Sequence, residues 1–177
     1  QFPKCKSNDA NLKSGMQELQ LNRKFFQPDG TPHFMMQGHP GLVSLCRMFA
    51  AVDDAKDLWL AFELCGQPLS KILFKTKGTF HKGERIYDVN QDVRVCQILE
   101  QDNCREFKKI IRRILLGLSL LSKIGLVHCD LKSENILISF DFKKQIVSSV
   151  KIIDFGTSFN FNVVNTEVQV TTPEYLP

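Results

Sequence analysis

Two short polar loops, each bordered by apolar residues, constrain the fold of this chain more than any other feature. The first lies in LVHCDLKSENIL (126–137), where a His, an Asp, a Lys and an Asn stand between two apolar runs. The second begins at the end of SVKIIDF (149–155), where IDFGTS carries an acid. Short apolar runs bounded by turn residues are typical of buried strands. The sequence therefore predicts a rigid pair of strands, 134–140 and 149–155, that carries Asp130 and Asp154.

The segment before the first loop predicts the clearest helix of the chain, over residues 105–123. Its apolar residues recur at spacings of three and four, which is the pattern of one buried helix face. Gly125 suits the position just after a helix end, where a left-handed backbone is common. The residues predicted to be buried are Phe107, Ile110, Ile111, Ile114, Leu115, Leu118 and Leu121.

The first third of the chain predicts a helix followed by two strands. MQELQLNRKFF (16–26) can form a short helix that ends at the turn residues QPDGTP (27–32). GLVSLCRMFAAV (41–52) and DLWLAFELC (57–65) are apolar, β-rich runs separated by a polar turn. We expect them to form two neighbouring buried strands.

The middle of the chain is less regular. A helix can start in QPLSKILF (67–74), because Pro68 fits the first turn of a helix. Residues 75–104 are charged, and we expect them to form an irregular, exposed insertion.

Composition excludes several classes of protein. The net charge of +4 comes without a dense Lys/Arg block, so we expect neither a nucleic-acid partner nor a membrane partner. The six cysteines show no CxxC pair, which argues against a zinc site and a disulfide framework and favours an intracellular, cytoplasmic location. The longest apolar stretch (110–127) contains three charged residues, so it is not expected to span a membrane.

The polar residues of the two loops suit the transfer of a charged group. One acid can orient a hydroxyl or accept its proton, while the other holds a divalent cation. Asn135 is a fitting second cation ligand because its side-chain oxygen is neutral. Lys132 is a point charge that can steady a phosphoryl group during transfer.

HCDLKSEN followed by DFG resembles the catalytic loop and the metal-binding loop of protein kinases. The likeness covers most of the chain in family order and is most specific over 126–156. It implies an α+β, protein-kinase-like fold with two lobes, in which 1–65 form a partial β-rich small lobe. Residues 66–177 would hold the hinge, the insertion, the long helix, both loops and the activation segment, as the start of the helical large lobe. The other matching segments are MQEL, HPGLVSL, LAFELCG and TTPEYLP.

The resemblance implies a role for each polar residue of the loops. Asp130 would orient the substrate hydroxyl and accept its proton, and Lys132 would stabilise the transferring phosphate. Asn135 and Asp154 would bind Mg²⁺, and His128 would brace the loop without acting as an acid or base. The implied reaction is transfer of the γ-phosphate of ATP to a protein, and Lys132 together with TPEY favours Ser or Thr as the acceptor.

The resemblance also implies an ATP site. Phe62 would line the back of the adenine pocket, while backbone groups of Glu63 and Cys65 would hydrogen-bond adenine. Glu18 would pair with the ATP-binding Lys, for which Lys4 is the candidate. Lys6 is a rival for that role. The residues implied to contact the cofactor are Phe62, Glu63, Cys65, Lys4 and Glu18.

The chain departs from the family pattern in three places. Cys129 stands where many kinases carry the Arg that grips a phosphorylated activation loop, which puts phosphate-dependent activation in doubt. The Gly-rich GxGxxG loop and the final Pro-Glu are missing, so we expect the chain to be a piece of a longer protein. The resemblance also implies that Thr172, in TPEY, would hydrogen-bond Asp130 and Lys132.

Two other functions fit the same sequence. A pseudokinase or truncated kinase fragment would act as a binding module, which the missing Gly-rich loop favours and the three intact residues Asp130, Asn135 and Asp154 disfavour. A small-molecule phosphotransferase shares the acidic loop and the later metal-binding acid. Lys132 and the TPEYLP ending favour a protein substrate instead.

Overall fold

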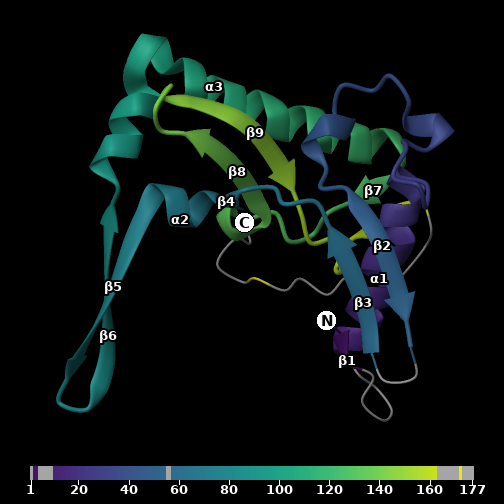
Figure 1. The fold of residues 1–177 in the computed structure, drawn as a ribbon, viewed down its shortest axis with the longest axis horizontal. Coiled ribbons are helices and arrows are strands. Elements are labelled where there is room, and N and C mark those ends of the chain that lie inside the picture. Colours follow the sequence, from purple (N-terminus) through teal and green to yellow (C-terminus); the bar gives the residue numbers. More distant parts are fainter. Residues whose placement is uncertain (1, 4–9, 55–56, 163–171, 173–177) are drawn as a thin grey trace.

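The computed structural model of the protein describes residues 2–3, 10–54, 57–162 and 172. A small sheet with one helix forms one part, and a long helix over a strand pair forms the other (Figure 1). This is the α+β, two-lobed arrangement that the sequence predicts. The elements are β1 (Phe2–Pro3), α1 (Ala10–Phe25), η1 (Phe34–Met36), η2 (Leu42–Ser44), β2 (Met48–Asp53), β3 (Asp57–Phe62), β4 (Gln67–Pro68), α2 (Leu69–Leu73), β5 (Phe74–His81), β6 (Glu84–Gln91), α3 (Val93–Lys123), β7 (Leu126–Val127), η3 (Ser133–Asn135), β8 (Ile136–Asp141), β9 (Ile146–Ile152) and β10 (Phe159–Asn160).

The small lobe is a three-stranded sheet in the order β1-β3-β2. β2 and β3 are antiparallel, with Val52 opposite Trp59. α1 covers this sheet, because Leu19 packs with Met48 and Leu58 in a buried cluster. The β-branched and aromatic residues of these runs suit such a half-buried pleated surface.

The two predicted strands of the small lobe are right in order and pairing but too long. The prediction that they are buried is wrong, because only Met48 of β2 and Leu58 of β3 are buried. β2 starts at Met48 and not at residue 41, and β3 ends at Phe62. Residues 42–44 form a 3₁₀ turn instead, and Leu45 makes a parallel bridge with Ile152 of β9. This stretch is apolar because it packs in the core between the lobes, where Leu45 is fully buried.

α1 is longer than predicted and packs against both lobes. It begins at Ala10, six residues before the predicted start. The sequence did not indicate this extension because residues 10–15 are mostly polar, although Leu12 packs beside Met16 against the cluster of Leu19. The turn after the helix is present, with the Gln27 N–H bonded to the Thr31 carbonyl at 2.8 Å. One turn earlier, Phe25 is fully buried in a cluster that includes Phe155. α1 is therefore in direct contact with the segment that follows β9.

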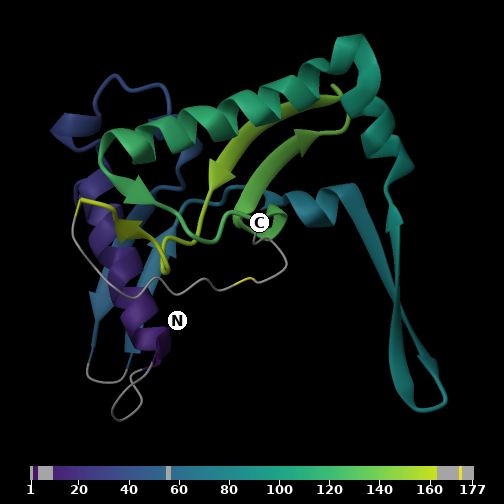
Figure 2. The same ribbon diagram turned by 180° about the vertical axis from the view of Figure 1, so that it is seen from behind.

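β8 and β9 form the antiparallel pair that the sequence predicts, with Ile136 opposite Ile152. They lie below α3 in Figure 1, and Figure 2 shows the same layer from behind. Ile110 of α3 packs with Ile138 and Val150 of the pair. This strand pair is the rigid support of the two polar loops.

α3 confirms the helix predicted over 105–123 and adds a turn region before it. Residues 101–104 have non-helical backbone angles, so a shorter helix over 93–100 precedes the predicted one. Gly125 follows the helix end with a φ of +74°, as predicted. Within the described residues, no helix combines the length and apolar content needed to cross a bilayer.

The predicted buried face of this helix is only partly right. Ile110 and Leu121 are almost fully buried, but Phe107, Ile111 and Leu115 are 49%, 40% and 59% exposed. These three lie four residues apart and form a separate stripe along one side of the helix. Spacings of three and four could not tell this stripe from the side that packs on β9.

Residues 75–91 are exposed as predicted, but Val95, Ile98 and Leu99 of the short helix that follows are buried. The prediction that 75–104 are irregular is wrong. β5 and β6 pair over their full length from Phe74–Gln91 to His81–Glu84. All their residues are exposed, and the hairpin projects away from the rest of the protein (Figure 1). Lys82 and Gly83 close it with φ values of +50° and +86°, which is the backbone that a two-residue hairpin turn requires.

Candidate functional site

His128 anchors the first polar loop to the segment before the second. Its Nε2 lies 3.0 Å from the Ile153 carbonyl, and the Asp130 N–H donates to its Nδ1 at 3.3 Å. Since Nδ1 accepts, the ring proton is on Nε2 and is donated to Ile153. Burial lowers the pKa of His128, so the ring is neutral at physiological pH. The Ser158 hydroxyl adds a bond to the His128 carbonyl at 3.1 Å.

Asp130, Lys132 and Thr172 form a closed set of polar contacts. The Lys132 ammonium is 2.8 Å from Asp130 Oδ2 and donates to the Thr172 hydroxyl at 2.8 Å. The Thr172 hydroxyl in turn donates to Asp130 Oδ1 at 2.5 Å. The contacts predicted for Thr172 are therefore present. The hydrogen bond with Asp130 raises the pKa of Lys132, which keeps this amine positively charged.

Asn135 joins the two loops. Its side-chain amide donates to Asp130 Oδ2 at 3.0 Å and to the Asp130 carbonyl at 2.9 Å. Its backbone carbonyl accepts from the Ile153 N–H at 3.0 Å, next to Asp154. With both described bonds on the amide nitrogen, the side-chain oxygen remains the atom suited to a hard cation.

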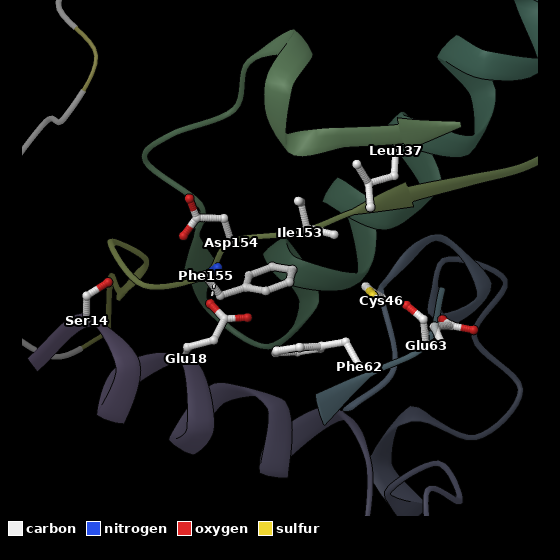
Figure 3. Close-up of a pocket in the computed structure, with 9 residues that line it drawn as sticks. All are labelled: Ser14, Glu18, Cys46, Phe62, Glu63, Leu137, Ile153, Asp154 and Phe155. Carbon is white, nitrogen blue, oxygen red and sulfur yellow. Dashed lines mark hydrogen bonds between the residues drawn. The ribbon is translucent and has the colours of Figure 1, made fainter. Parts of the chain in front are cut away.

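Asp154 and Phe155 follow β9 and point in different directions. Asp154 has a φ of +66° and is exposed, with its carboxylate at the edge of a cavity (Figure 3). Phe155 is 1% exposed, and its ring packs against Phe25 and His128 with 5.1 Å between centroids in each case. A left-handed residue between a strand and a buried aromatic is uncommon outside glycine, and such strain is typical of functional loops.

Glu18 of α1 reaches this second loop. Its Oε2 accepts a hydrogen bond from the Phe155 N–H, drawn as a dashed line in Figure 3. Its Oε1 accepts from the buried Asn22 amide at 2.9 Å. Burial raises the pKa of Glu18 to about 7, and the nearby negative charge of Asp154 acts in the same direction. Glu18 is therefore a carboxyl group that changes charge near neutral pH.

A cavity of about 480 Å³ lies where α1, the end of β3 and the end of β9 meet (Figure 3). It brings together four residues that the sequence singles out, from three distant segments: Glu18, Phe62, Glu63 and Asp154. Phe62, which is 36% exposed, faces this space. The volume lies in the range of small-molecule sites.

The side chain of Glu63 makes two hydrogen bonds that the sequence did not predict. Its Oε1 accepts from the Lys151 ammonium at 2.6 Å and from the Arg47 N–H at 2.8 Å. Burial opposes ionisation of Glu63, but these two donors outweigh it and lower its pKa. Cys65 is held nearby, since its carbonyl accepts from the Ser139 hydroxyl at 3.2 Å. Segment 63–66 is thus fastened to both strands of the β8–β9 pair.

The proposed ATP-binding lysines, Lys4 and Lys6, lie outside the described residues. Five residues of this region were not predicted as site residues from the sequence: the cavity-lining Ser14, Cys46, Leu137 and Ile153, and also Lys151. Lys151 had a detectable pattern, because a charged residue inside an apolar strand usually has a buried partner. Ser14 and Cys46 lie in stretches with no distinguishing pattern.

Comparisons with known proteins indicate the family of the chain. The family model for the protein kinase domain matches residues 32–177. The chain is 49% identical over 51 residues to a dual specificity protein kinase YAK1 homolog of Arabidopsis thaliana, which covers 29% of this chain and 5% of that protein. It is 46% identical over 63 residues to the DYRK-family kinase pom1 of Schizosaccharomyces pombe, covering 35% and 5%. It is 34% identical over 125 residues to the cell division control protein 2 homolog 3 of Trypanosoma brucei brucei, covering 71% and 30%.

The chain spans only 5% to 30% of the length of these three relatives. The family match nevertheless extends over most of the chain, and it includes both polar loops and the cavity-lining residues Phe62 of β3 and Asp154 after β9. The chain belongs to the protein kinase family.

Proposed function

We propose that this chain is the catalytic part of an ATP-dependent protein serine/threonine kinase. The observation that carries the proposal is the set of contacts around Asp130, whose carboxylate accepts from the Thr172 hydroxyl and lies against the Lys132 ammonium. A carboxylate in that setting can orient a substrate hydroxyl and take its proton. Lys132 would stabilise the charge on the transferring phosphoryl group.

Asn135 and Asp154 would hold Mg²⁺. The amide oxygen of Asn135 and the carboxylate of Asp154 are the hard oxygen ligands that this ion prefers, and the backbone bond between Asn135 and Ile153 keeps the two residues near each other. When bound, Mg²⁺ supplies charge neutralisation for the phosphates of ATP. The other residues of the loops act by position: His128 fixes the backbone of Asp130, and Asn135 fixes its carboxylate.

The cavity between α1 and the strand ends would hold ATP. Phe62 would line its back wall, and the Glu63 carbonyl and the Cys65 N–H would hydrogen-bond adenine. The Glu63 N–H is bonded to the Arg47 carbonyl at 2.9 Å, whereas the Glu63 carbonyl accepts only weak thiol hydrogen bonds, from Cys46 at 3.7 Å and from Cys65 at 3.4 Å. This difference supports the division, because adenine can replace the weaker bonds. Glu18 would pair with Lys4, with Lys6 as the rival.

In domain terms, residues 1–65 would be the small lobe without the Gly-rich loop. Residues 66–177 would provide the hinge, the insertion, the long helix, both loops and the activation segment. Ser and Thr as acceptors are supported by Lys132 and the TPEY sequence. Two relatives have "dual specificity" or the DYRK family in their names, so Tyr is the acceptor to test against. An intracellular, cytoplasmic location remains part of the proposal.

The test has two steps. First, Mg²⁺-dependent binding of a fluorescent ATP analogue is measured for the chain and for Asp154→Asn, with Asp141→Asn at the end of β8 as a matched control. We expect binding that is lost in Asp154→Asn and kept in the control. Second, the longest available parent protein is offered Ser, Thr and Tyr peptides and an aminated sugar, with Asp130→Asn as the inactive reference.

Each outcome separates the alternatives. Phosphate transfer to Ser and Thr peptides that requires Asp130 supports the proposal, and transfer to Tyr as well would make the enzyme dual specificity. Transfer to the sugar alone would indicate a small-molecule phosphotransferase. Nucleotide binding without transfer to any acceptor would refute the catalytic proposal and favour a pseudokinase that acts as a binding module.

A further inference from the structure

Three side chains around segment 63–66 bring together the donor atoms of a metal site. The sulfurs of Cys46 and Cys65 and a carboxylate oxygen of Glu63 all lie within 4.8 Å of one another. The two sulfurs are 3.0 Å apart, and both thiols are free. We propose that these three residues bind a thiophilic divalent cation of the Zn²⁺ class. This goes against the expectation, drawn from the cysteine spacing, that the chain has no zinc site.

The fold holds these donors in place without any metal. The Glu63 N–H bonds the Arg47 carbonyl at 2.9 Å, and the Arg47 N–H returns to Glu63 Oε1 at 2.8 Å. Met48 pairs with Phe62 just beyond, so residue 46 and residues 63–65 are fixed beside each other by the sheet. A site whose ligands are already close loses little conformational entropy when the ion binds.

The Glu63 carboxylate has an oxygen left for coordination. Both of its described hydrogen bonds, from Lys151 and from Arg47, are accepted by Oε1. Oε2 can therefore face a cation while Oε1 keeps its partners, and hydrogen-bonded carboxylates of this kind are typical of metal sites. Two thiolates and one carboxylate would balance a divalent ion and the charge of Lys151, which leaves the cluster neutral.

The distances require only a small adjustment. Zn²⁺ binds thiolate at about 2.3 Å, so two thiolates of a tetrahedral site lie about 3.8 Å apart. The sulfurs would thus separate by less than about 1 Å, which side-chain rotation can supply. Cys46 and Glu63 also line the cavity, so a fourth position would be open to water there (Figure 3). Three protein ligands and one open position is a familiar arrangement for this ion.

The plain alternative is that the two cysteines only pack as small apolar side chains, as most buried cysteines do. A disulfide is a poorer alternative, because burial raises the pKa of both thiols and a protonated thiol reacts slowly with oxidants. Binding of the ion would release two thiol protons to the buffer. The affinity should therefore rise up to about 100-fold per pH unit, in a site faced by Glu63, Lys151 and Arg47.

The test uses Cd²⁺, which gives an ultraviolet sulfur-to-metal charge-transfer band, on a chain that keeps only this cysteine pair. We expect one Cd²⁺ per chain with a band of two thiolates, in the presence of a phosphine reductant, and competition by Zn²⁺. Cys65→Ser should weaken binding about 100-fold and Glu63→Gln about 10-fold. The other cysteines replaced by Ser in this background are Cys5, Cys96, Cys104 and Cys129.

A matched control chain has two cysteines that do not form the proposed site. The chain with Cys46 and Cys96 as its cysteines should bind Cd²⁺ no better than the Cys65→Ser chain, and circular dichroism checks that each variant is folded. Equal Cd²⁺ affinity of the pair and this control would overturn the inference. So would the absence of a two-thiolate band, or conversion of the pair to a disulfide that leaves no metal bound.

Discussion

The buried Glu18 carboxyl makes a quantitative prediction about stability and pH. Its ordinary pKa of 4.5 rises to about 7 in the folded chain, chiefly because it is buried. Below pH 4.5 it is protonated in both the folded and the unfolded chain. As pH rises through the range from 4.5 to 7, the unfolded chain loses this proton first, so the free energy of unfolding falls. Each unit of pKa difference between the folded and the unfolded chain corresponds to about 1.4 kcal/mol. The free energy of unfolding should therefore fall by about 3 kcal/mol in total.

Glu18→Gln removes this titration and should abolish the loss. Relative to the natural chain, we expect the free energy of unfolding of the Gln variant to rise by about 2.5 kcal/mol between pH 5 and pH 8. Urea unfolding followed by circular dichroism at four pH values measures the difference. Glu106→Gln is the control: desolvation favours the neutral form of Glu106, but the Val147 N–H hydrogen bond together with the charges of Lys109 and Arg105 lowers its pKa overall. Its stabilising effect is lost only in acid, so the stability difference for this variant should stay level over the same window.

If the difference in unfolding free energy between Glu18→Gln and the natural chain did not change with pH, the pKa of Glu18 would not be raised in the folded chain. The physical reason would be a cation near Glu18, since an opposite charge within hydrogen-bonding distance lowers the pKa of a carboxyl. That outcome would favour Lys4 or Lys6 as its partner, and repeating the series with Lys4→Met and Lys6→Met would show which.

Three further experiments test a close backbone approach, a buried aromatic and an exposed apolar stripe. Gly66→Ala should cost about 3 kcal/mol of unfolding free energy, because φ is +101° and a Cβ would lie 2.3 Å from a β8 carbonyl oxygen. Gly83→Ala, with open space around it, should cost about 1 kcal/mol, and equal losses would contradict the close approach. Phe25→Ala should cost about 4 kcal/mol in urea unfolding against under about 0.5 for the exposed Phe34→Ala. Leu115→Lys should reduce binding of the dye ANS at unchanged stability; undiminished dye fluorescence would mean that the exposed stripe on α3 is not the surface it detects.

The parts of the fold that the sequence predicted are those where burial leaves a pattern. The strands β8 and β9 are short apolar runs between turn residues, and helix 105–123 repeats apolar residues at helical spacing. The β5–β6 hairpin was missed because every one of its residues is exposed, so neither strand shows an apolar alternation that identifies a buried face. The start of α1 was missed for a related reason, since residues 10–15 are mostly polar.

The site was predictable only where its residues lie close together in the chain. Asp130, Lys132 and Asn135 fall within six residues, and their mutual contacts follow from one loop. The bond between Glu18 and the Phe155 N–H joins positions 137 residues apart. The proximity of Cys46 and Cys65 likewise depends on the pairing of β2 with β3. No local pattern encodes such contacts, because they arise only when separate elements pack.

The contacts of α1 with the segment after β9 have a consequence for how that segment can move. Gln17 donates to the Ser158 carbonyl, Glu18 accepts from the Phe155 N–H, and Phe25 packs edge-on against the Phe155 ring. All three side chains belong to one stiff rod more than two turns long. A tilt or rotation of the rod would break the three contacts together, and a partial release would leave buried polar groups without partners. α1 and the segment after β9 should therefore switch together between two positions, engaged and released, with no graded series of states between them.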